Sequence, residues 1–363
     1  MSKFRIFATC DIGEAALDRL RSRGWEVEIW PEMDPPPYEV VLEKVRSGVD
    51  ALITTLRDRI DEGIFAAGAG RLKVVAQDAV GHDNIDREAA NRYRIPFTNT
   101  PDVLTHATAE FAFFILGAVA RKLFPSEELV RAGKWRTWHP YLPFLGTEVT
   151  GKTVAVIGTG RIGRAFAGKC AGFDLDLLLY DTRPDPAFAE ALQRLAEERR
   201  RLGLAERQCR VAYVDLRTAL GEADFVSLHV PLTPETRHLL NEERLSWMKP
   251  TAYLINTSRG PVVDEQALAD ALLSGRLAGA ALDVFGQEPL PLSSPLLAPE
   301  LREKVRVFHH FASGTAETRL SPDPARGMAG RCVQALIDVL EGRYGGDPGK
   351  MPWVVNKEAF SGR

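Results

Sequence analysis

Ionisable side chains directly follow three apolar, β-rich runs in the second half of the chain. Arg259 follows "AYLIN", Asp283 and Glu288 lie in "DVFGQEP" after "GAAL", and His309 and His310 follow "VRVF". The carboxyl ends of parallel strands meet at one edge of a sheet, so these side chains are expected to converge there. A guanidinium binds anions, and a carboxylate-supported imidazole can donate a proton. Beside a dinucleotide, such a set would suit hydride transfer to an anionic carbonyl compound.

A glycine-rich segment has the pattern of a dinucleotide-binding turn. In "TVAVIGTGRIGRAF", Gly158, Gly160 and Gly163 have GxGxxG spacing between an apolar strand and a helix. These glycines would permit the turn, the approach of a pyrophosphate and close packing of the helix, whose N-terminus would face the phosphates. Asp181 ends the next strand and would accept both ribose hydroxyls, which favours NAD over NADP although Arg183 follows it closely. An ordinary strand–turn–helix unit is the alternative.

The elements that must carry these residues form two series of alternating strands and helices. Strands are predicted at "FRIFAT", "VEIW", "DALITT", "KVVAQ" and "IPFTNT", and then at "TVAVIG", "LDLLLYD", "QCRVAYV", "DFVSLHV", "AYLINT" and "GAALDVF". This rhythm predicts an α/β fold with two doubly wound parallel-sheet domains, one flavodoxin-like and one Rossmann-like, and a cleft between them. We place 1–103 plus 312–363 in a substrate domain and 104–311 in the dinucleotide-binding domain. Residues 184–208 are predicted to be a charged, solvated helical insertion, because three consecutive arginines are a weak signal for binding.

The composition excludes several classes of protein. A length of 363 residues exceeds one ordinary core, and a net charge of −3 gives no global attraction to nucleic acid or to an anionic membrane. Four scattered cysteines without a CxxC pair predict neither a disulfide framework nor a metal site. The N-terminus shows no signal-peptide pattern, and the apolar run 109–120 is too short to span a membrane. We therefore expect a cytoplasmic protein with a buried core helix at 109–120.

Long motifs carry a family resemblance over nearly the whole chain. "TVAVIGTGRIG", "HVPLTPETRHLLNEERLSWMKPTAYLINTSRGPVVDE", "ALDVFGQEP" and "HHFASGT" resemble the D-isomer-specific 2-hydroxyacid dehydrogenases. "AVGHDNID", "NTPDVLTHATAEFAF" and "VVNKEAF" are most similar to the glyoxylate/hydroxypyruvate reductase branch. The resemblance implies an NAD(H)-dependent reduction of a small 2-keto acid to the D-2-hydroxy acid.

The resemblance also implies three catalytic residues. Arg259 would grip the substrate carboxylate and polarise its carbonyl, His310 would donate the proton, and Glu288 would keep that imidazole protonated near neutrality. His309 occupies the usual place of a proline, and we expect it to be structural or to line the outer pocket.

Further positions match family residues that surround the cofactor. Asp283 would bind the nicotinamide carboxamide. The resemblance gives the remaining cofactor-binding set as Thr108, Gly158, Thr159, Gly160, Arg161, Ile162, Gly163, Asp181, His229, Val230, Pro231, Thr257, Ser258, Arg259, His310 and Ser313. Six of them could also be ordinary strand-end or helix-start residues: Thr108, His229, Val230, Pro231, Thr257 and Ser258.

The substrate end of the site is expected from the first domain. By resemblance, the backbone N–H groups of Val80 and Gly81 would meet the substrate carboxylate opposite Arg259, and Leu56 would line the pocket. Gln77 is harder to place, and a plain strand-end role fits it equally well. A pocket this sparse suits a short acid such as glyoxylate or hydroxypyruvate.

The density of aromatic residues in the segment 133–146, "GKWRTWHPYLPFLG", predicts burial against something beyond its own domain. In the resembled family it belongs to a two-fold dimer contact, with Trp138 or His139 toward the partner's site. We therefore expect a homodimer.

Three alternatives stay open. One is another specificity, for D-lactate, D-glycerate, phosphoglycerate or phosphite, whereas Glu288 argues against formate. A regulatory phosphoglycerate dehydrogenase is disfavoured because no room for a further domain follows "VVNKEAF". The second is a NAD-sensing protein like the corepressors of this fold. The third, a methyltransferase, would not require the Arg/Glu/His set.

Overall fold

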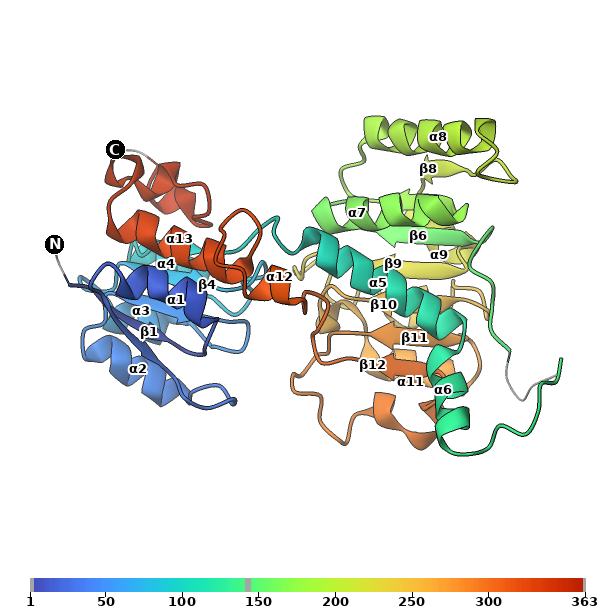
Figure 1. The fold of residues 1–363 in the computed structure, drawn as a ribbon, viewed down its shortest axis with the longest axis horizontal. Helices are drawn as coiled ribbons and strands as arrows, with labels where there is room; N and C mark the ends of the chain where they lie inside the picture. The colour runs from blue at the N-terminus through green and yellow to red at the C-terminus, as the bar shows by residue number, and fades with distance from the viewer. Residues whose placement is uncertain (1–2, 141–144, 362–363) are drawn as a thin grey trace. The chain divides into compact units, whose positions relative to one another are not determined.

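The computed structural model describes residues 3–140 and 145–361. The chain forms two compact units, one built from residues 1–104 and 314–363 and the other from residues 105–313 (Figure 1). Each unit contains one parallel sheet with helices on both faces, so the predicted α/β class with two doubly wound sheets is confirmed. None of the described helices combines the length and the apolar character that crossing a membrane requires.

The sheet of the first unit has five parallel strands in the order β2-β1-β3-β4-β5, which is flavodoxin-like. Its strands are β1 (Arg5–Ala8), β2 (Glu26–Ile29), β3 (Ala51–Thr54), β4 (Val74–Gln77) and β5 (Phe97–Thr98). Its helices are α1 (Glu14–Arg21), α2 (Tyr38–Arg46), α3 (Glu62–Ala67), α4 (Arg87–Arg92), α12 (Ala316–Arg319) and α13 (Met328–Leu340).

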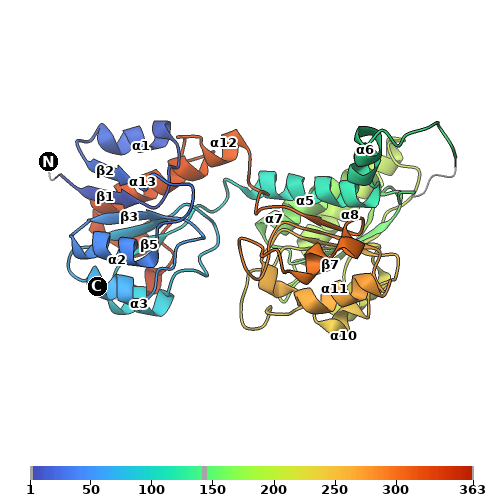
Figure 2. The ribbon, with the colours of Figure 1, turned by 90° about the horizontal axis from the view of Figure 1, so that it is seen from below.

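Alternating side chains of the first sheet enter two apolar layers, because successive strand residues point to opposite faces. Ile6 and Ala8 pack with α1 and α13, whereas Phe7 packs on the other face with α2, α3 and α4. Figure 2 shows α1 and α13 on one face of the sheet and α2 and α3 on the other. Every residue of β3 and β4 is buried, as expected for central strands covered on both sides. The substrate residues predicted for this unit follow the carboxyl ends of these two strands.

The sheet of the second unit has seven parallel strands in the order β12-β11-β10-β9-β6-β7-β8. The strand order reverses between β6 and β9, and in Rossmann-like sheets this switch point is where dinucleotides bind. The strands are β6 (Thr153–Ile157), β7 (Asp176–Tyr180), β8 (Val211–Tyr213), β9 (Phe225–Leu228), β10 (Tyr253–Asn256), β11 (Gly279–Leu282) and β12 (Val305–Val307).

The helices of the second unit cover both faces of its sheet. They are α5 (Thr105–Ala120), α6 (Leu123–Arg131), α7 (Arg161–Cys170), α8 (Pro186–Arg201), α9 (Leu216–Glu222), α10 (Glu242–Leu245) and α11 (Glu265–Leu273). The core layer on one face takes residues from α5, α7 and α8, and the layer on the other face takes them from α9, α10 and α11. The charged helix α8 connects β7 to β8 and buries Leu192 and Ala196.

Candidate active site

The turn between β6 and α7 leaves no room for side chains at two of its glycines. Gly158 has a φ of 94°, and a Cβ added there would lie 2.8 Å from the carbonyl oxygen of His229. A Cβ on Gly163 would lie 1.9 Å from the carbonyl oxygen of Gly158, so helix α7 packs directly on the turn. A Cβ on Gly160 would instead meet nothing within 4 Å. The open side of the turn therefore lies at Gly160, where α7 begins and its first N–H groups lack helical partners.

Asp181, directly after β7, is tied to the same turn. Its carboxylate accepts hydrogen bonds from the Thr159 N–H at 2.7 Å, the Thr159 hydroxyl at 3.1 Å and the Arg183 N–H at 2.9 Å. Burial works to raise the pKa of Asp181, but the hydrogen bonds from Arg183 and Thr159 together hold it below its ordinary value. An ionised carboxylate next to this glycine turn fits the ribose hydroxyls of a dinucleotide.

His229 closes the other side of the turn. Its Nε2 lies 2.9 Å from the Ser227 hydroxyl, and its ring centroid lies 4.8 Å from that of Phe166 on α7. Burial lowers the pKa of His229 to about 3, so this imidazole is neutral at physiological pH. His229 therefore packs against the turn and is not a candidate for the proton donor.

The loop that carries Arg259 is held by a residue that the sequence did not single out. Asn256, at the end of β10, is almost fully buried. Its Oδ1 accepts from the Ser258 N–H at 3.0 Å and from the Ser258 hydroxyl at 2.7 Å, and its Nδ2 donates to the Arg259 carbonyl at 3.0 Å. These three bonds fix the backbone on both sides of the Arg259 Cα. The sequence signal that could have found this support is an asparagine at the end of a predicted strand, three residues before the arginine.

Gly260 joins the Arg259 loop to the loop that leads to Glu288. A Cβ on Gly260 would lie 1.8 Å from the carbonyl carbon of Phe285 and 2.4 Å from the Gly286 nitrogen. Only glycine lets the two backbones come this close. The predicted convergence of Arg259 and Glu288 therefore rests on direct backbone packing between neighbouring strand-end loops.

Glu288 and His310 form the hydrogen-bonded pair at the centre of the candidate site. Glu288 Oε2 lies 2.8 Å from His310 Nδ1, and Glu288 Oε1 accepts from the Phe285 N–H at 3.0 Å. Burial works to raise the pKa of Glu288, but the bond to His310 and the charges of His310 and Arg259 leave it below its ordinary value. Glu288 is therefore a carboxylate at neutral pH, and the Nδ1 that faces it carries a proton.

The backbone of His310 has a φ of 55°, in the left-handed region that residues with a Cβ seldom adopt. Asp283 holds it there. The Asp283 carbonyl accepts from the His310 N–H at 2.9 Å, and its carboxylate accepts from the Phe311 and Ala312 N–H groups at 2.6 and 2.8 Å. Burial, the largest influence, raises the pKa of Asp283 despite these bonds. The structure thus gives Asp283 a loop-holding role, in addition to the carboxamide contact that the resemblance implies.

His309 lies beside the pair without entering it. Its ring stacks on Phe311 with centroids 5.1 Å apart, and of the two histidines it is His310 that bonds to Glu288. The geometry supports the choice of His310 over His309 as the proton donor.

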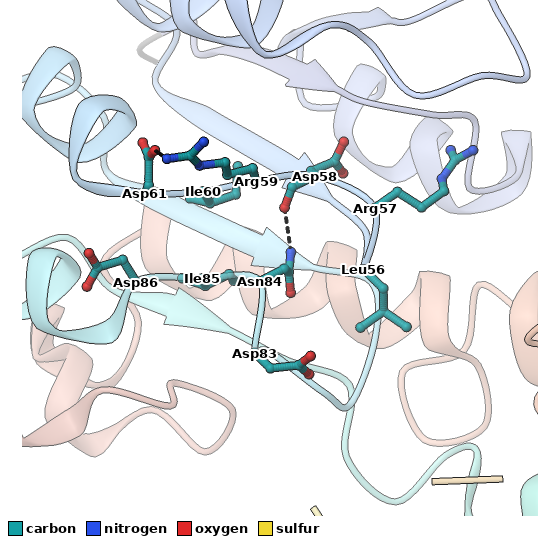
Figure 3. A pocket seen from close by; sticks show the side chains of 10 residues that line it. All are labelled: Leu56, Arg57, Asp58, Arg59, Ile60, Asp61, Asp83, Asn84, Ile85 and Asp86. Atoms are coloured by element: carbon teal, nitrogen blue, oxygen red, sulfur yellow. Dashed lines mark hydrogen bonds and ion pairs between the residues drawn. The ribbon is translucent and has the colours of Figure 1, made fainter. Parts of the chain in front are cut away.

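The three substrate residues predicted in the first unit lie in two of its strand-end loops. Leu56 follows β3, and Val80 and Gly81 follow β4. Leu56 lines a hollow of about 380 Å³ between the loops after β3 and β4 (Figure 3). Its full lining is Leu56, Arg57, Asp58, Arg59, Ile60, Asp61, Asp83, Asn84, Ile85 and Asp86.

Among residues 3–140 and 145–361, no group of three or more metal-ligating side chains occurs.

Comparison with known proteins identifies the type of the second unit. Residues 113–312 match the family described as D-isomer specific 2-hydroxyacid dehydrogenase, NAD binding domain. The chain is 45% identical over 318 residues to a protein named glyoxylate reductase from Korarchaeum cryptofilum (strain OPF8), covering 87% of this chain and 89% of that protein.

Two further relatives match almost end to end. A protein named glyoxylate reductase from Thermococcus gammatolerans is 43% identical over 366 residues, covering 98% of this chain and 97% of that protein. The crystal structure of the TT0316 protein from Thermus thermophilus matches with a TM-score of 0.82 and 39% identity, covering 97% of this chain and 100% of that one.

Proposed function

The chain belongs to the D-isomer specific 2-hydroxyacid dehydrogenase family, and from this premise we propose that it reduces glyoxylate, and also hydroxypyruvate, with NADH. The names of the relatives support the substrate, and the site supports the chemistry. The observation that carries the proposal is the 2.8 Å contact between Glu288 and His310 beside the Arg259 loop, in the unit that holds the dinucleotide turn.

The Glu288–His310 pair supplies the proton of the reduction. With Nδ1 held by the carboxylate, the Nε2 side of His310 is the one that can donate a proton to the carbonyl oxygen of the substrate. The neutral imidazole formed in this step keeps its Nδ1 proton and its bond to Glu288. The proton-donating edge therefore keeps its orientation through the reaction.

Arg259 binds the carboxylate of the 2-keto acid and draws electron density from the neighbouring carbonyl. A guanidinium is a cation whose two parallel N–H groups match a planar carboxylate. Asn256 and Gly260 set the position of the arginine backbone, and the guanidinium Nη1 donates to the Ser258 carbonyl at 2.8 Å.

The dinucleotide turn and Asp181 fit an NAD cofactor. Bound NADH would supply the hydride. Gly160 faces open space at the start of α7, where a pyrophosphate can approach the helix N-terminus. Asp181 would accept the ribose hydroxyls and repel a 2′-phosphate, so we propose NADH as the preferred form. The remaining predicted cofactor residues, among them Thr108, Thr257 and Ser313, keep that role as part of this proposal.

The second unit is proposed to bind the dinucleotide and the first unit the substrate carboxylate. In this assignment the backbone N–H groups of Val80 and Gly81 receive the carboxylate, and Leu56 lies beside the short substrate chain. Short 2-keto acids require no further polar side chain from the first unit.

We also propose that the protein is a homodimer. In the single chain the side chains of Trp135 and Trp138 are 61% and 80% exposed, which is a large apolar area for water to cover. Residues 141–144 of the predicted contact segment lie outside the described residues. Light scattering at micromolar concentration should give twice the chain mass, and a monomer would contradict the proposal.

A spectrophotometric assay tests the function directly. NADH absorbance should fall when glyoxylate or hydroxypyruvate is added, and hydroxypyruvate should yield D-glycerate. Arg259→Ala should abolish turnover, while Arg210→Ala, which removes a surface arginine paired with Glu222, should leave it unchanged. Binding of NADH without turnover of any acid in a 2-keto acid panel would refute the enzyme and favour a NAD sensor.

A further inference from the structure

Three successive backbone carbonyls in the loop after β4 accept hydrogen bonds from other residues of the same unit. The Ala79 carbonyl accepts from the Thr100 N–H at 2.9 Å, and the Val80 carbonyl accepts from the Asn99 side-chain amide at 2.8 Å. The Gly81 carbonyl accepts from the Gln77 side-chain amide at 3.2 Å. Two of these three donors are side chains, so the conformation of the loop depends on the identity of residues outside it.

The three bonds determine where the N–H groups of the loop point. In a trans peptide the N–H points away from the carbonyl of the same peptide unit. The carbonyls of Ala79 and Val80 both face the segment 99–100, so the N–H groups of Val80 and Gly81 both face the opposite side. Neither of these two N–H groups donates a hydrogen bond to any residue that the structure describes. Successive N–H groups on one side of a chain form a concave anion-binding nest.

A directional chain of amides connects this nest to the loop that carries Leu56. The Thr54 hydroxyl donates to Gln77 Oε1 at 2.8 Å, and Gln77 Nε2 donates to Asn84 Oδ1 at 2.7 Å as well as to Gly81. Asn84 Nδ2 then donates to the Thr55 carbonyl at 3.0 Å. It also donates to the Asp58 carbonyl at 2.7 Å (Figure 3). Because each carbonyl at the end of the chain requires a donor, neither amide can flip without losing its bonds.

We infer that Asn99 and Gln77 are positioning residues for the substrate carboxylate, because their side-chain amides orient the Val80 and Gly81 N–H groups as an anion-binding nest. The inference rests on the proposed function, in which these N–H groups receive the carboxylate. Gln77 is fully buried and Asn99 half-buried, so neither amide needs to touch the substrate to act. The strand-end role that the sequence left open for Gln77 thus becomes a functional one.

The test compares Asn99→Ala and Gln77→Met with a matched control, Asn356→Ala. Asn356 is a fully buried amide of the same unit that binds the Phe97 N–H at 3.0 Å and the Ile95 carbonyl at 3.1 Å, on the far side of β5. Removing either positioning amide should raise KM for glyoxylate about tenfold, leave KM for NADH within about twofold and change kcat less than about threefold. A tenfold loss equals about 1.4 kcal/mol, the size of one hydrogen bond. Asn356→Ala should lower the melting temperature and leave KM for glyoxylate unchanged.

A binding measurement separates this inference from the proposed function. Calorimetry with oxamate, an unreactive carboxylate of substrate size, in the presence of NADH should show about tenfold weaker binding to Asn99→Ala. If the wild-type protein turns over glyoxylate but Asn99→Ala binds substrate and oxamate as tightly as wild type, the inference is wrong and the function stands. An equal loss in Asn356→Ala would also overturn it. Tenfold weaker oxamate binding by Asn99→Ala, without any turnover by the wild type, would support the nest and refute the reductase.

Discussion

Replacing Glu288 by glutamine should move the pH dependence of reduction without removing the site. Glutamine has the shape of glutamate, and its carbonyl oxygen can still accept from the Phe285 N–H. Its amide group, however, would face His310 Nδ1 as a donor and so favour an unprotonated ring nitrogen there. The imidazolium form of His310 loses its anionic partner, and the form that can donate a proton becomes scarcer as pH rises.

The size of this shift follows from the geometry of the pair. A hydrogen bond to a charged group is worth roughly 1.5–3 kcal/mol. The side chains of His310 and Glu288 are 29% and 36% exposed, so solvent screens the pair and the lower end applies. About 1.4 kcal/mol corresponds to one pH unit. The alkaline limb of kcat/KM should therefore move down by about one unit, with a smaller change on the acidic plateau.

The assay is a pH profile of glyoxylate reduction for wild type, Glu288→Gln and Glu265→Gln. Glu265 is the matched control, because its carboxylate also accepts a backbone N–H of this loop, that of Gly286, but bonds to no histidine among the described residues. Glu265→Gln should keep the wild-type limb. A Glu288→Gln profile that coincides with wild type, or an equal shift in Glu265→Gln, would refute the assignment of the proton donor.

Three further perturbations follow from the same geometry. Asp181→Ala should lower the preference for NADH over NADPH at least about tenfold in steady-state kinetics, because the carboxylate that opposes a 2′-phosphate is lost. Gly260→Ala should lower the melting temperature by several degrees and abolish turnover, because its Cβ would lie 1.8 Å from the Phe285 carbonyl carbon. The control Gly168→Ala should be tolerated, because its Cβ would meet nothing within 4 Å. Burial, partly offset by the charge of Arg319, raises the pKa of Asp78 to about 7, so the folded state favours the protonated acid. The stability of wild type should fall as pH rises from about 4 through about 7, and thermal melting of Asp78→Asn should lack this slope.

The fold was predictable because its strands differ from their surroundings in composition. β4 and β10 are runs of buried residues, and such runs between turn residues are typical of central parallel strands. The glycine turn was predictable because its three glycines have the spacing of one local motif, in which Gly158 and Gly163 leave no room for a Cβ and Gly160 faces open space. The short strand β8, by contrast, is only half-buried, and the predicted run 208–214 was longer than the strand Val211–Tyr213.

The strand-end positions of the side chains that we propose react could be predicted, but the residues that support them could not. Arg259, Glu288 and His310 are chemically conspicuous residues directly after strands, and strand ends converge in any doubly wound sheet. The loop-holding role of Asp283 depends on the path of the chain after His310. His310 itself has a left-handed backbone conformation, which its residue type does not predict. The close contact of Gly260 with Phe285 likewise depends on the pairing of β10 with β11.

Amide side chains show why such supports escape sequence reasoning. Gln77 and Thr54 are 23 residues apart in the chain, yet they are register partners on β3 and β4, and only that register brings the hydroxyl to the amide oxygen. A shift of the register by one residue would turn Gln77 to the other face of the sheet and leave the Gly81 carbonyl without its donor. The sequence shows that a glutamine ends the strand, whereas the pairing of β3 with β4 determines which loop this glutamine orients. The backbone N–H groups that we propose bind a carboxylate therefore depend, in this unit, on sheet register as much as on the loop sequence itself.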